Sequence, residues 1–170
     1  METAAFGRLR KALEDFFIRL LIRRGITESE QKRRKGKMAV KMYWLGAEER
    51  LTFQRFLDRG YIVGKVKTGV LLENERSRKV AAKGGKFYEG QAKLLMWKID
   101  AVIEAEEAVW VVQVTDVLGI GDIEKVMRYK KAYEEQYKPK KPVKMAIVAK
   151  VDRPKLHYLM RDLGIRWFIV

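Results

Sequence analysis

The stretch KIDAVIEAEEAVWVVQVT, residues 98–115, decides the fold. It is mostly apolar, and its centre carries two adjacent glutamates, Glu106 and Glu107, which predict a tight turn. The flanking chain predicts one strand over 94–105 and a second over 108–114. The two strands therefore form a hairpin. Because side chains alternate along a strand, we expect Asp100 to lie opposite roughly position 113.

The chain after this hairpin alternates between helix and strand. Gly119 and Gly121 mark a loop. The near-continuous apolar run that follows Pro142 is typical of a buried parallel strand. The elements expected on this side are a helix over 123–137, a strand over 143–149, a short helix between Pro154 and Gly164, and a last strand over 165–170.

The chain before the hairpin begins with an amphipathic pattern over 46–60, which predicts a helix running into a strand over 61–63. Residues 64–93 are rich in glycine and are interpreted as irregular, with a loop or loose hairpin at 76–86. The whole order predicts an α/β fold of three layers. Its mixed sheet of four to five strands is flanked by helices.

The composition favours an anionic partner. The 170 residues carry a formal net charge of +15, from 37 Lys and Arg against 22 Asp and Glu. Such a surplus is typical of proteins that bind nucleic acid or an anionic membrane. There is no cysteine and a single histidine, His157, which excludes disulfides, thiol catalysis and a multi-histidine metal site. Any metal is expected to be a hard ion held by carboxylates, Mg²⁺ or Mn²⁺.

Residue usage also indicates the setting. A single asparagine, no cysteine and abundant Glu, Lys and Arg are typical of thermophilic proteins. The most apolar early run, residues 16–22, is short and interrupted by Arg19, so it is neither a membrane span nor a signal sequence. We therefore expect a cytoplasmic protein with no membrane partner.

The first 45 residues are expected to form an extension to a domain over 46–170. Apolar residues spaced by three and four over 2–24 predict an amphipathic helix, which hints at a homodimer. A dense basic run follows at 32–37. It is either a solvated linker or helix face, or an arm that contacts phosphates.

The charge pattern reverses around the 98–115 hairpin. Between Ile99 and Glu124 there is no Lys or Arg, but there are seven acidic residues. Four of these are explained by a polar turn or a helix start, namely Glu106, Glu107, Asp122 and Glu124. Asp100 differs, because a carboxylate among apolar strand neighbours is unfavourable unless it is paired or bound. Asp100 is therefore the strongest candidate for a functional residue.

Several segments together resemble the PD-(D/E)XK nuclease superfamily, which includes archaeal Holliday-junction resolvases and many restriction enzymes. GAEERL at 46–51 and FLDRGYIV at 56–63 look like its first core helix and strand, and KIDAVIE at 98–104 with VWVVQVT at 109–115 looks like its hairpin. MRYKK at 127–131 and MAIVA at 145–149 continue the likeness, which covers about 125 residues. Residues 98–170 also resemble archaeal nuclease-like domains of unknown function.

The resemblance implies a metal-dependent site with two departures. Asp100 matches the family's metal-binding Asp, and Glu49, or the adjacent Glu48, matches its helix glutamate. Gln113 stands where the family has Glu, and Thr115 where it has the catalytic Lys. Gln carries no charge for a metal, and Thr supplies no cation for the phosphate. Catalysis would then need a relocated lysine, Lys125 or Lys98.

These observations leave three functional hypotheses. The first is nucleic-acid binding, DNA in particular, on a nuclease-like fold with a decayed catalytic site. The second is an active Mg²⁺-dependent endonuclease that uses Asp100, Gln113, Glu49 and Lys125, the first three holding the metal. The third is an assembly protein that oligomerises through the N-terminal helix. Three basic segments are expected to contact nucleic acid, and one of them is 138–144. The residues expected from the other two are Lys32, Arg33, Arg34, Lys35, Arg76, Arg78, Lys79, Lys83 and Lys86.

Overall fold

The computed structural model describes residues 44–170 and places the expected hairpin at the centre of the sheet. Its strands are β2 (Trp97–Glu104) and β3 (Val109–Val117). They run antiparallel, with Glu104 paired to Val109 across the turn. The hairpin prediction is confirmed, although its first strand begins at 97 and not at 94.

Five strands form one mixed sheet in the order β1-β2-β3-β4-β5. The outer strands are β1 (Lys65–Leu72), β4 (Val143–Val151) and β5 (Ile165–Ile169). Strand β1 pairs antiparallel with β2, while β4 and β5 continue from β3 in parallel. The sequence prediction of a mixed sheet, and of a buried parallel strand starting at Val143, is confirmed.

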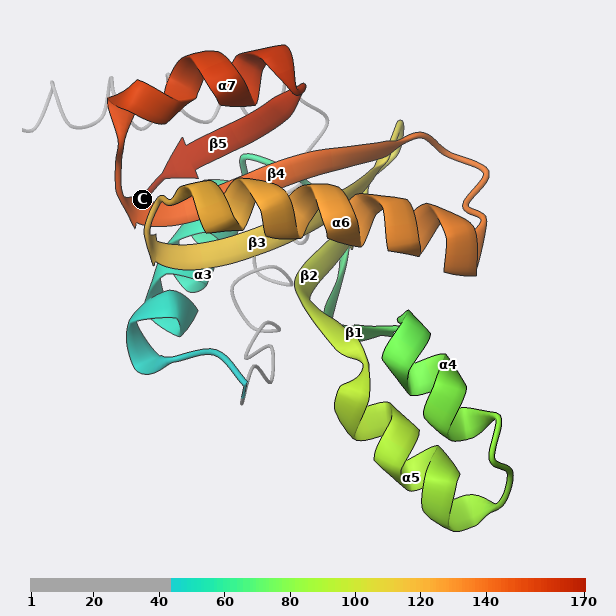
Figure 1. The fold of residues 1–170 in the computed structure, drawn as a ribbon. Helices are drawn as coiled ribbons and strands as arrows, with labels where there is room; N and C mark the ends of the chain where they lie inside the picture. Colours follow the sequence, from blue (N-terminus) through green and yellow to red (C-terminus); the bar gives the residue numbers. More distant parts are fainter. Residues whose placement is uncertain (1–43) are drawn as a thin grey trace, which may run out of the picture. The chain divides into compact units, whose positions relative to one another are not determined.

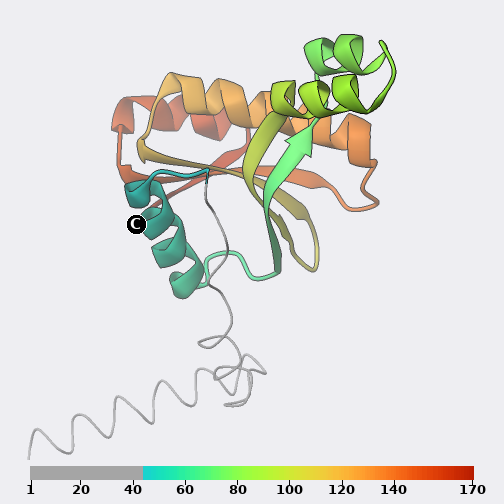
Figure 2. The same cartoon turned by 90° about the horizontal axis from the view of Figure 1, so that it is seen from below.

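Helices cover both faces of the sheet, as Figures 1 and 2 show. On one face lie α6 (Ile120–Tyr137) and α7 (His157–Asp162), which follows a short 3₁₀ turn, η1 (Pro154–Leu156). Their apolar residues pack with Val111 and Met145 of the sheet in the main core. On the other face lies α3 (Ala47–Arg59), whose Phe56 ring is 5.1 Å from that of Phe168. The three-layer α/β prediction is confirmed.

The strand predicted at 61–63 is wrong. Helix α3 ends at Gly60, which has a φ of 65°, and the chain turns through residues 60–64 before β1 begins. The Tyr61 ring packs 5.0 Å from Phe168, which ties this turn to the sheet. Gly64 then passes so close to β2 that a Cβ there would lie 2.4 Å from the Glu104 carbonyl oxygen.

The irregular segment predicted at 64–93 is also wrong. After β1, the chain forms two helices, α4 (Glu75–Ala81) and α5 (Lys86–Leu95), joined through Gly84 and Gly85. Asn74 starts α4, because its side chain accepts a hydrogen bond from the Ser77 amide and the Ser77 hydroxyl closes the capping box. Residues 75–95, named here the basic hairpin, project from the sheet (Figure 1).

The remaining boundaries follow the sequence closely. The expected helix over 46–60 is α3, and the expected helix after Pro154 is η1 with α7. The loop predicted at Gly119 and Gly121 is corrected, because Gly119 is the N-cap of α6 and Gly121 lies inside its first turn. The N-terminal helix and basic run predicted over 1–45 lie outside the described residues, apart from 44 and 45.

Candidate functional site

Asp100 occupies the point where β2 and β3 part. Their pairing runs from Glu104 and Val109 to Ala101 and Val112. At the next position the Asp100 carboxylate replaces a strand carbonyl, and its Oδ2 accepts a hydrogen bond from the Val114 amide at 2.8 Å. A buried amide needs such an acceptor. The Asp100 side chain is 9% exposed, so its charge is largely removed from water.

The two residues that depart from the resembled motif lie on β3 beside Asp100. Gln113 is 6% exposed, and its Nε2 donates to the Val114 carbonyl at 3.0 Å. Thr115 is half-buried, and its hydroxyl donates to the Val117 carbonyl at 3.2 Å. Both side chains thus bond to the backbone of their own strand. Neither adds a charge next to Asp100.

Two helix starts bring further carboxylates toward Asp100. Glu49 accepts a hydrogen bond from the Gly46 amide at 2.9 Å in the first turn of α3. Asp122 accepts one from the Gly119 amide at 2.9 Å in the first turn of α6. Carboxylates are favoured at both places because helix starts expose unpaired amides. We call Glu49, Asp100 and Asp122 the acidic centre.

Two members of the acidic centre, Asp100 and Asp122, hold protons more tightly than free carboxylates do. Burial raises the pKa of Asp100 from 3.8 to about 6 against the opposing Val114 hydrogen bond, and the charges of Glu49 and Asp122 raise it further. Burial likewise raises the pKa of Asp122, against the hydrogen bond from Gly119. Shifted carboxylates in one place are typical of functional sites, although structural networks produce them too.

Glu49, and not Glu48, belongs to this centre. Glu48 is exposed and forms an ion pair with Lys150 of β4. The hydrogen bond that the Lys150 Nζ donates within this pair lowers the pKa of Glu48. Glu49 instead faces the partly buried side of α3, where its charge acts on both Asp100 and Asp122. Of the two helix glutamates left open by the sequence, Glu49 is the one near Asp100.

Of the two lysines considered as a relocated cation, Lys125 is the one whose charge acts on Asp100 and Asp122. It is exposed on α6, and its charge partly opposes the rise that burial causes in the pKa of Asp100 and of Asp122. Lys98, the other candidate, lies with its Nζ 5.4 Å from the centre of the Trp44 ring. Four residues expected to act together, Asp100, Gln113, Glu49 and Lys125, are therefore placed in one region of the fold.

As arranged, the acidic centre is not a formed metal site. Within residues 44–170, no three acidic or histidine side chains lie close enough together to hold a metal ion. One oxygen of each of Glu49, Asp122 and Asp100 already accepts a hydrogen bond from a backbone amide. Gln113 contributes no charge, although Mg²⁺ and Mn²⁺ favour charged oxygen ligands.

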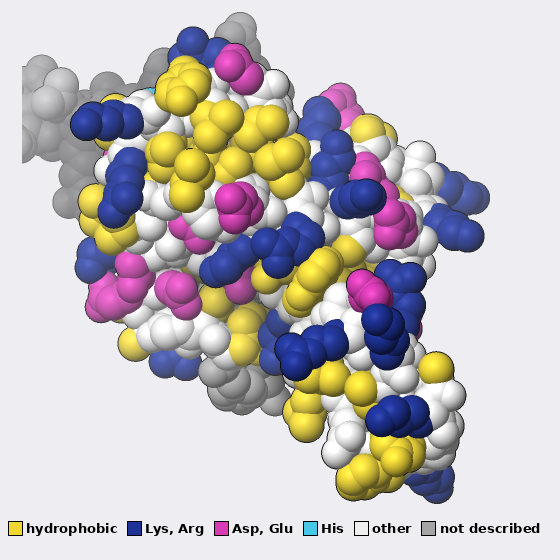
Figure 3. Space-filling model, in the orientation of Figure 1, with side chains coloured by type: hydrophobic (Ala, Val, Ile, Leu, Met, Phe, Trp, Pro, Cys, Tyr) yellow, Lys and Arg dark blue, Asp and Glu magenta, His cyan; other side chains and the backbone are white. Residues whose placement is uncertain are grey.

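The expected basic residues of 76–86 come together on the basic hairpin. Arg76, Arg78 and Lys79 lie on α4, Lys83 lies in the connection, and Lys86 begins α5. All five are exposed. Figure 3 shows Lys and Arg side chains gathered over this part of the molecule, beside hydrophobic ones. The other four expected residues, Lys32, Arg33, Arg34 and Lys35, lie outside the described part of the chain.

The segment 138–144, expected to bind as well, lies at the start of β4. Lys141 donates from its Nζ to the Ala105 carbonyl at 2.9 Å, beside the turn of the β2–β3 hairpin. Lys144 lies with its Nζ 5.6 Å from the centre of the Trp110 ring. Two of these lysines are thus held against the turn end of the hairpin. The basic hairpin leaves the sheet at the opposite end of β2.

Sequence reasoning missed the place of Asp122 in the centre. It was interpreted only as a favourable residue for a helix start, a role that the structure does show. What was missed is where the start of this helix lies relative to β3. A helix that starts right after β3 brings its first turn to the end of the strand that carries Gln113 and Thr115. The available signal was Asp122 three residues after Gly119, where an acidic side chain can accept a hydrogen bond from the N-cap amide.

Comparison with known proteins finds no matching family model, no matching curated protein and no matching solved structure. In the described residues, no helix combines the length and the apolar character that crossing a membrane requires. The function must therefore be argued from the geometry of this chain.

Proposed function

We propose that this protein binds nucleic acid, DNA in particular, through phosphate contacts on a nuclease-like fold whose catalytic set is incomplete. The observation that carries the proposal is the basic hairpin. It holds six Lys and Arg against two Glu and projects from the sheet. Clustered cations on an exposed element bind the phosphate backbone by releasing its counterions.

Most of the hairpin's charge is available to a ligand. Lys79 pairs with Glu75 one turn away, and Lys83 lies 5.4 Å from the centre of the Tyr88 ring. Exposed contacts of this kind are weak, at about 0.2–1 kcal/mol, so a phosphate can displace them. The chain's overall charge of +15 adds a long-range attraction to any polyanion.

The acidic centre supports the binding side of the proposal over catalysis. Gln113 and Thr115 bond to the backbone of their own strand, so neither supplies the charge that a catalytic carboxylate and lysine would supply. Contacts to phosphates carry little sequence information. Binding is therefore expected to depend strongly on salt and weakly on sequence.

The test is a salt titration of binding to labelled duplex and single-stranded DNA. Each phosphate contact contributes a slope of about 0.9 in the plot of log affinity against log salt for duplex DNA. Neutralising Arg78, Lys83 and Lys86 to Gln is expected to reduce the slope by about 2–3. The matched control neutralises three exposed cations near α7, Arg153, Lys155 and Arg161. Affinity that ignores salt would overturn the proposal.

A second candidate, an active endonuclease, is favoured by one observation. The charge of Lys125 acts on both Asp100 and Asp122, as the charge of a relocated catalytic lysine would. The test is cleavage of duplex, single-stranded and branched DNA with Mg²⁺ and with Mn²⁺. Cleavage that disappears with both Asp100→Ala and Lys125→Ala supports the enzyme. Cleavage that survives Asp100→Ala reports a contaminating nuclease.

A further inference from the structure

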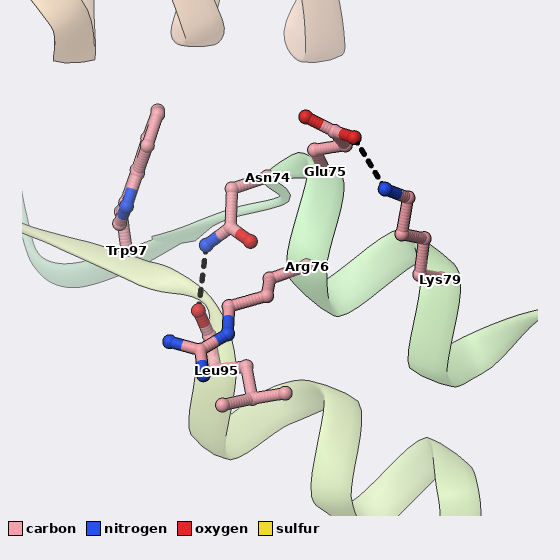
Figure 4. Close-up of a pocket in the computed structure, with 6 residues that line it drawn as sticks. All are labelled: Asn74, Glu75, Arg76, Lys79, Leu95 and Trp97. Carbon is pink, nitrogen blue, oxygen red and sulfur yellow. Dashed lines mark hydrogen bonds and ion pairs between the residues drawn. The ribbon is translucent and has the colours of Figure 1, made fainter.

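A hollow of about 500 Å³ lies where the basic hairpin meets the sheet. Its walls come from α4 with its N-cap, from the end of α5 and from the start of β2 (Figure 4). The lining residues are Asn74, Glu75, Arg76, Lys79, Leu95 and Trp97. We call it the Trp97 pocket. Its volume lies in the range of roughly 300–1,000 Å³ that is typical of small-molecule sites.

The pocket offers an aromatic wall that is fixed in place. Trp97 is half-buried, and its ring centre lies 6.4 Å from that of Tyr129 on α6. The Arg128 guanidinium carbon lies 5.2 Å from the centre of the same indole. These contacts hold the ring in one orientation, so little freedom remains to be lost when a flat ligand stacks on it.

The pocket is also lined by a cation, Arg76, that can bind an anion. Figure 4 shows the Arg76 side chain reaching from α4 toward Leu95, with Trp97 on the β2 side. Within residues 44–170, Lys79 has an ion pair with Glu75, but Arg76 has none. A guanidinium binds phosphate well, because its fork of donors matches the phosphate oxygens.

The lining of the pocket also includes a hydrogen-bonded connection between the two helices and the apolar side chain of Leu95. The Asn74 side chain donates to the Leu95 carbonyl at 2.6 Å, which ties the start of α4 to the end of α5. Leu95 itself lines the pocket. The site therefore combines a stacking face, an apolar side chain and one unpaired cation. A nucleotide offers a flat base to the stacking face and a phosphate to the cation.

We propose that the Trp97 pocket holds one unpaired base of a bound nucleic-acid strand, stacked on the indole, with a neighbouring phosphate paired to Arg76. The inference rests on the proposed nucleic-acid binding and specifies its ligand. Base stacking on an aromatic side chain is sequence-tolerant, since every base presents a flat face. A base inside a continuous duplex is stacked on its neighbours and is not free to enter. The ligand is thus a single-stranded or branched nucleic acid.

The position of the pocket suits such a ligand. Tyr129 lies beside Trp97, and burial raises the pKa of Tyr129, with the charge of Asp100 raising it further. The Trp97 pocket and the acidic centre are thus neighbours across one residue of α6. Lys125 and Arg128 are both exposed on α6, so the helix that carries Tyr129 also offers two cations to a phosphate backbone.

The decisive experiment compares Arg76→Gln with Arg78→Gln. The two residues are exposed on the same helix and carry the same charge, but only Arg76 lines the pocket. The probes are oligodeoxythymidine and oligouridine of about 12 nucleotides, a duplex of equal length and an abasic strand. Arg76→Gln is expected to weaken single-strand binding about tenfold and duplex binding much less, while Arg78→Gln weakens both alike.

The fluorescence of Trp97 provides a second readout, which is measured on the wild-type protein and so does not depend on the stability of a variant. Stacking is expected to quench the fluorescence of the wild-type protein on single-strand binding. The quench should be absent in Trp97→Phe, which keeps a stacking ring and retains Trp44, Trp110 and Trp167. An abasic strand should bind about tenfold more weakly than oligodeoxythymidine and produce no quench.

The outcomes separate the two proposals. If Arg76→Gln and Arg78→Gln behave alike and the abasic strand binds as well as oligodeoxythymidine, the pocket proposal is overturned, while binding through phosphates stands. If the wild-type protein binds no nucleic acid at low salt, the proposed function itself fails. Selective loss with Arg76→Gln, together with a quench that depends on Trp97, supports both.

Discussion

Replacing Asp100 with Asn should make the protein more stable at neutral pH. Asn keeps an oxygen that can accept the Val114 amide, and it removes a charge that is 9% exposed. The folded state raises the pKa of Asp100 from 3.8 to about 6. At about 1.4 kcal/mol for each tenfold change in the ionisation constant, ionising Asp100 in the folded protein costs about 3 kcal/mol.

The sign follows from linkage. The folded state binds the proton of Asp100 more tightly than the unfolded state, so its contribution to stability is complete below about pH 3.8 and is lost as pH rises through about 6. As the pH rises from about 4 to about 7, the free energy of unfolding of wild type should therefore drop by up to about 3 kcal/mol relative to that of Asp100→Asn.

The assay is urea unfolding of the full chain, followed by tryptophan fluorescence at a series of pH values. The unfolding slope should be unchanged, since the same surface is exposed in both proteins. The matched control is Asp116→Asn, an exposed carboxylate on β3. If the stability difference between wild type and Asp100→Asn is the same at every pH, burial does not disfavour the ionised carboxylate and the reasoning fails.

Four further predictions concern the backbone and the ligand. Gly69→Ala should destabilise the fold by about 1–3 kcal/mol in thermal unfolding, because Gly69 has a φ of 61° and a Cβ there would lie 2.8 Å from the Trp44 ring. Gly90→Ala, inside α5 with open space around it, should instead stabilise by about 0.5–1 kcal/mol, and equal effects would contradict both expectations. Asn74→Ala should cost about 1–2 kcal/mol and speed hydrogen exchange in α4 and α5 but not in α6, since it removes a cap and the bond to Leu95. DNA affinity at fixed salt, measured by fluorescence anisotropy, should rise as pH falls from about 8 to about 5 because a protonated Asp100 repels phosphate less, and this rise should be smaller in Asp100→Asn.

The central strands were predictable because burial acts on every residue in them. Ile99, Val111 and Ile147 are fully buried, and such positions leave an unambiguous apolar pattern in the sequence. The same holds for α3, whose Phe53 and Phe56 are fully buried at helical spacing. The position of Asp100 beside Gln113 then followed from strand alternation and from the turn at Glu106 and Glu107.

The basic hairpin was not predictable in the same way, because its helices bury little. Only Ser77 in α4 and Ala92 in α5 are buried, so no apolar stripe marks either helix. Three glycines, Gly84, Gly85 and Gly90, favoured a loop instead. The helices depend on local signals, namely the Asn74 cap and the helix-favouring Arg, Lys and Ala that follow it. Strand β1 was missed for a similar reason, since it lies at the sheet edge and carries Lys65 and Lys67 outward.

The candidate site was only partly readable, because its members are drawn from three separate elements. Asp100 was identifiable from its own strand, as a charge among apolar neighbours. Glu49 and Asp122 each have a sufficient local role as helix caps, and their approach to Asp100 depends on how α3 and α6 pack at the sheet. Trp97 and Arg76 line one pocket only because α4 and α5 fold back on each other, which the sequence pattern did not indicate.

Asp100 is also the residue for which folding alone gives no sufficient reason. The Val114 amide needs an acceptor, but Asn would provide one without the cost of about 3 kcal/mol that a buried charge imposes at neutral pH. Local rules are broken in this way mainly where function requires it. A carboxylate that is near half-protonation at pH 6, faces the positive charge of Lys125 and lies next to the Trp97 pocket can change its charge when a phosphate backbone arrives. Under the proposed function, the charge of Asp100 would thus set the pH range in which a strand binds, whether or not that strand is cleaved.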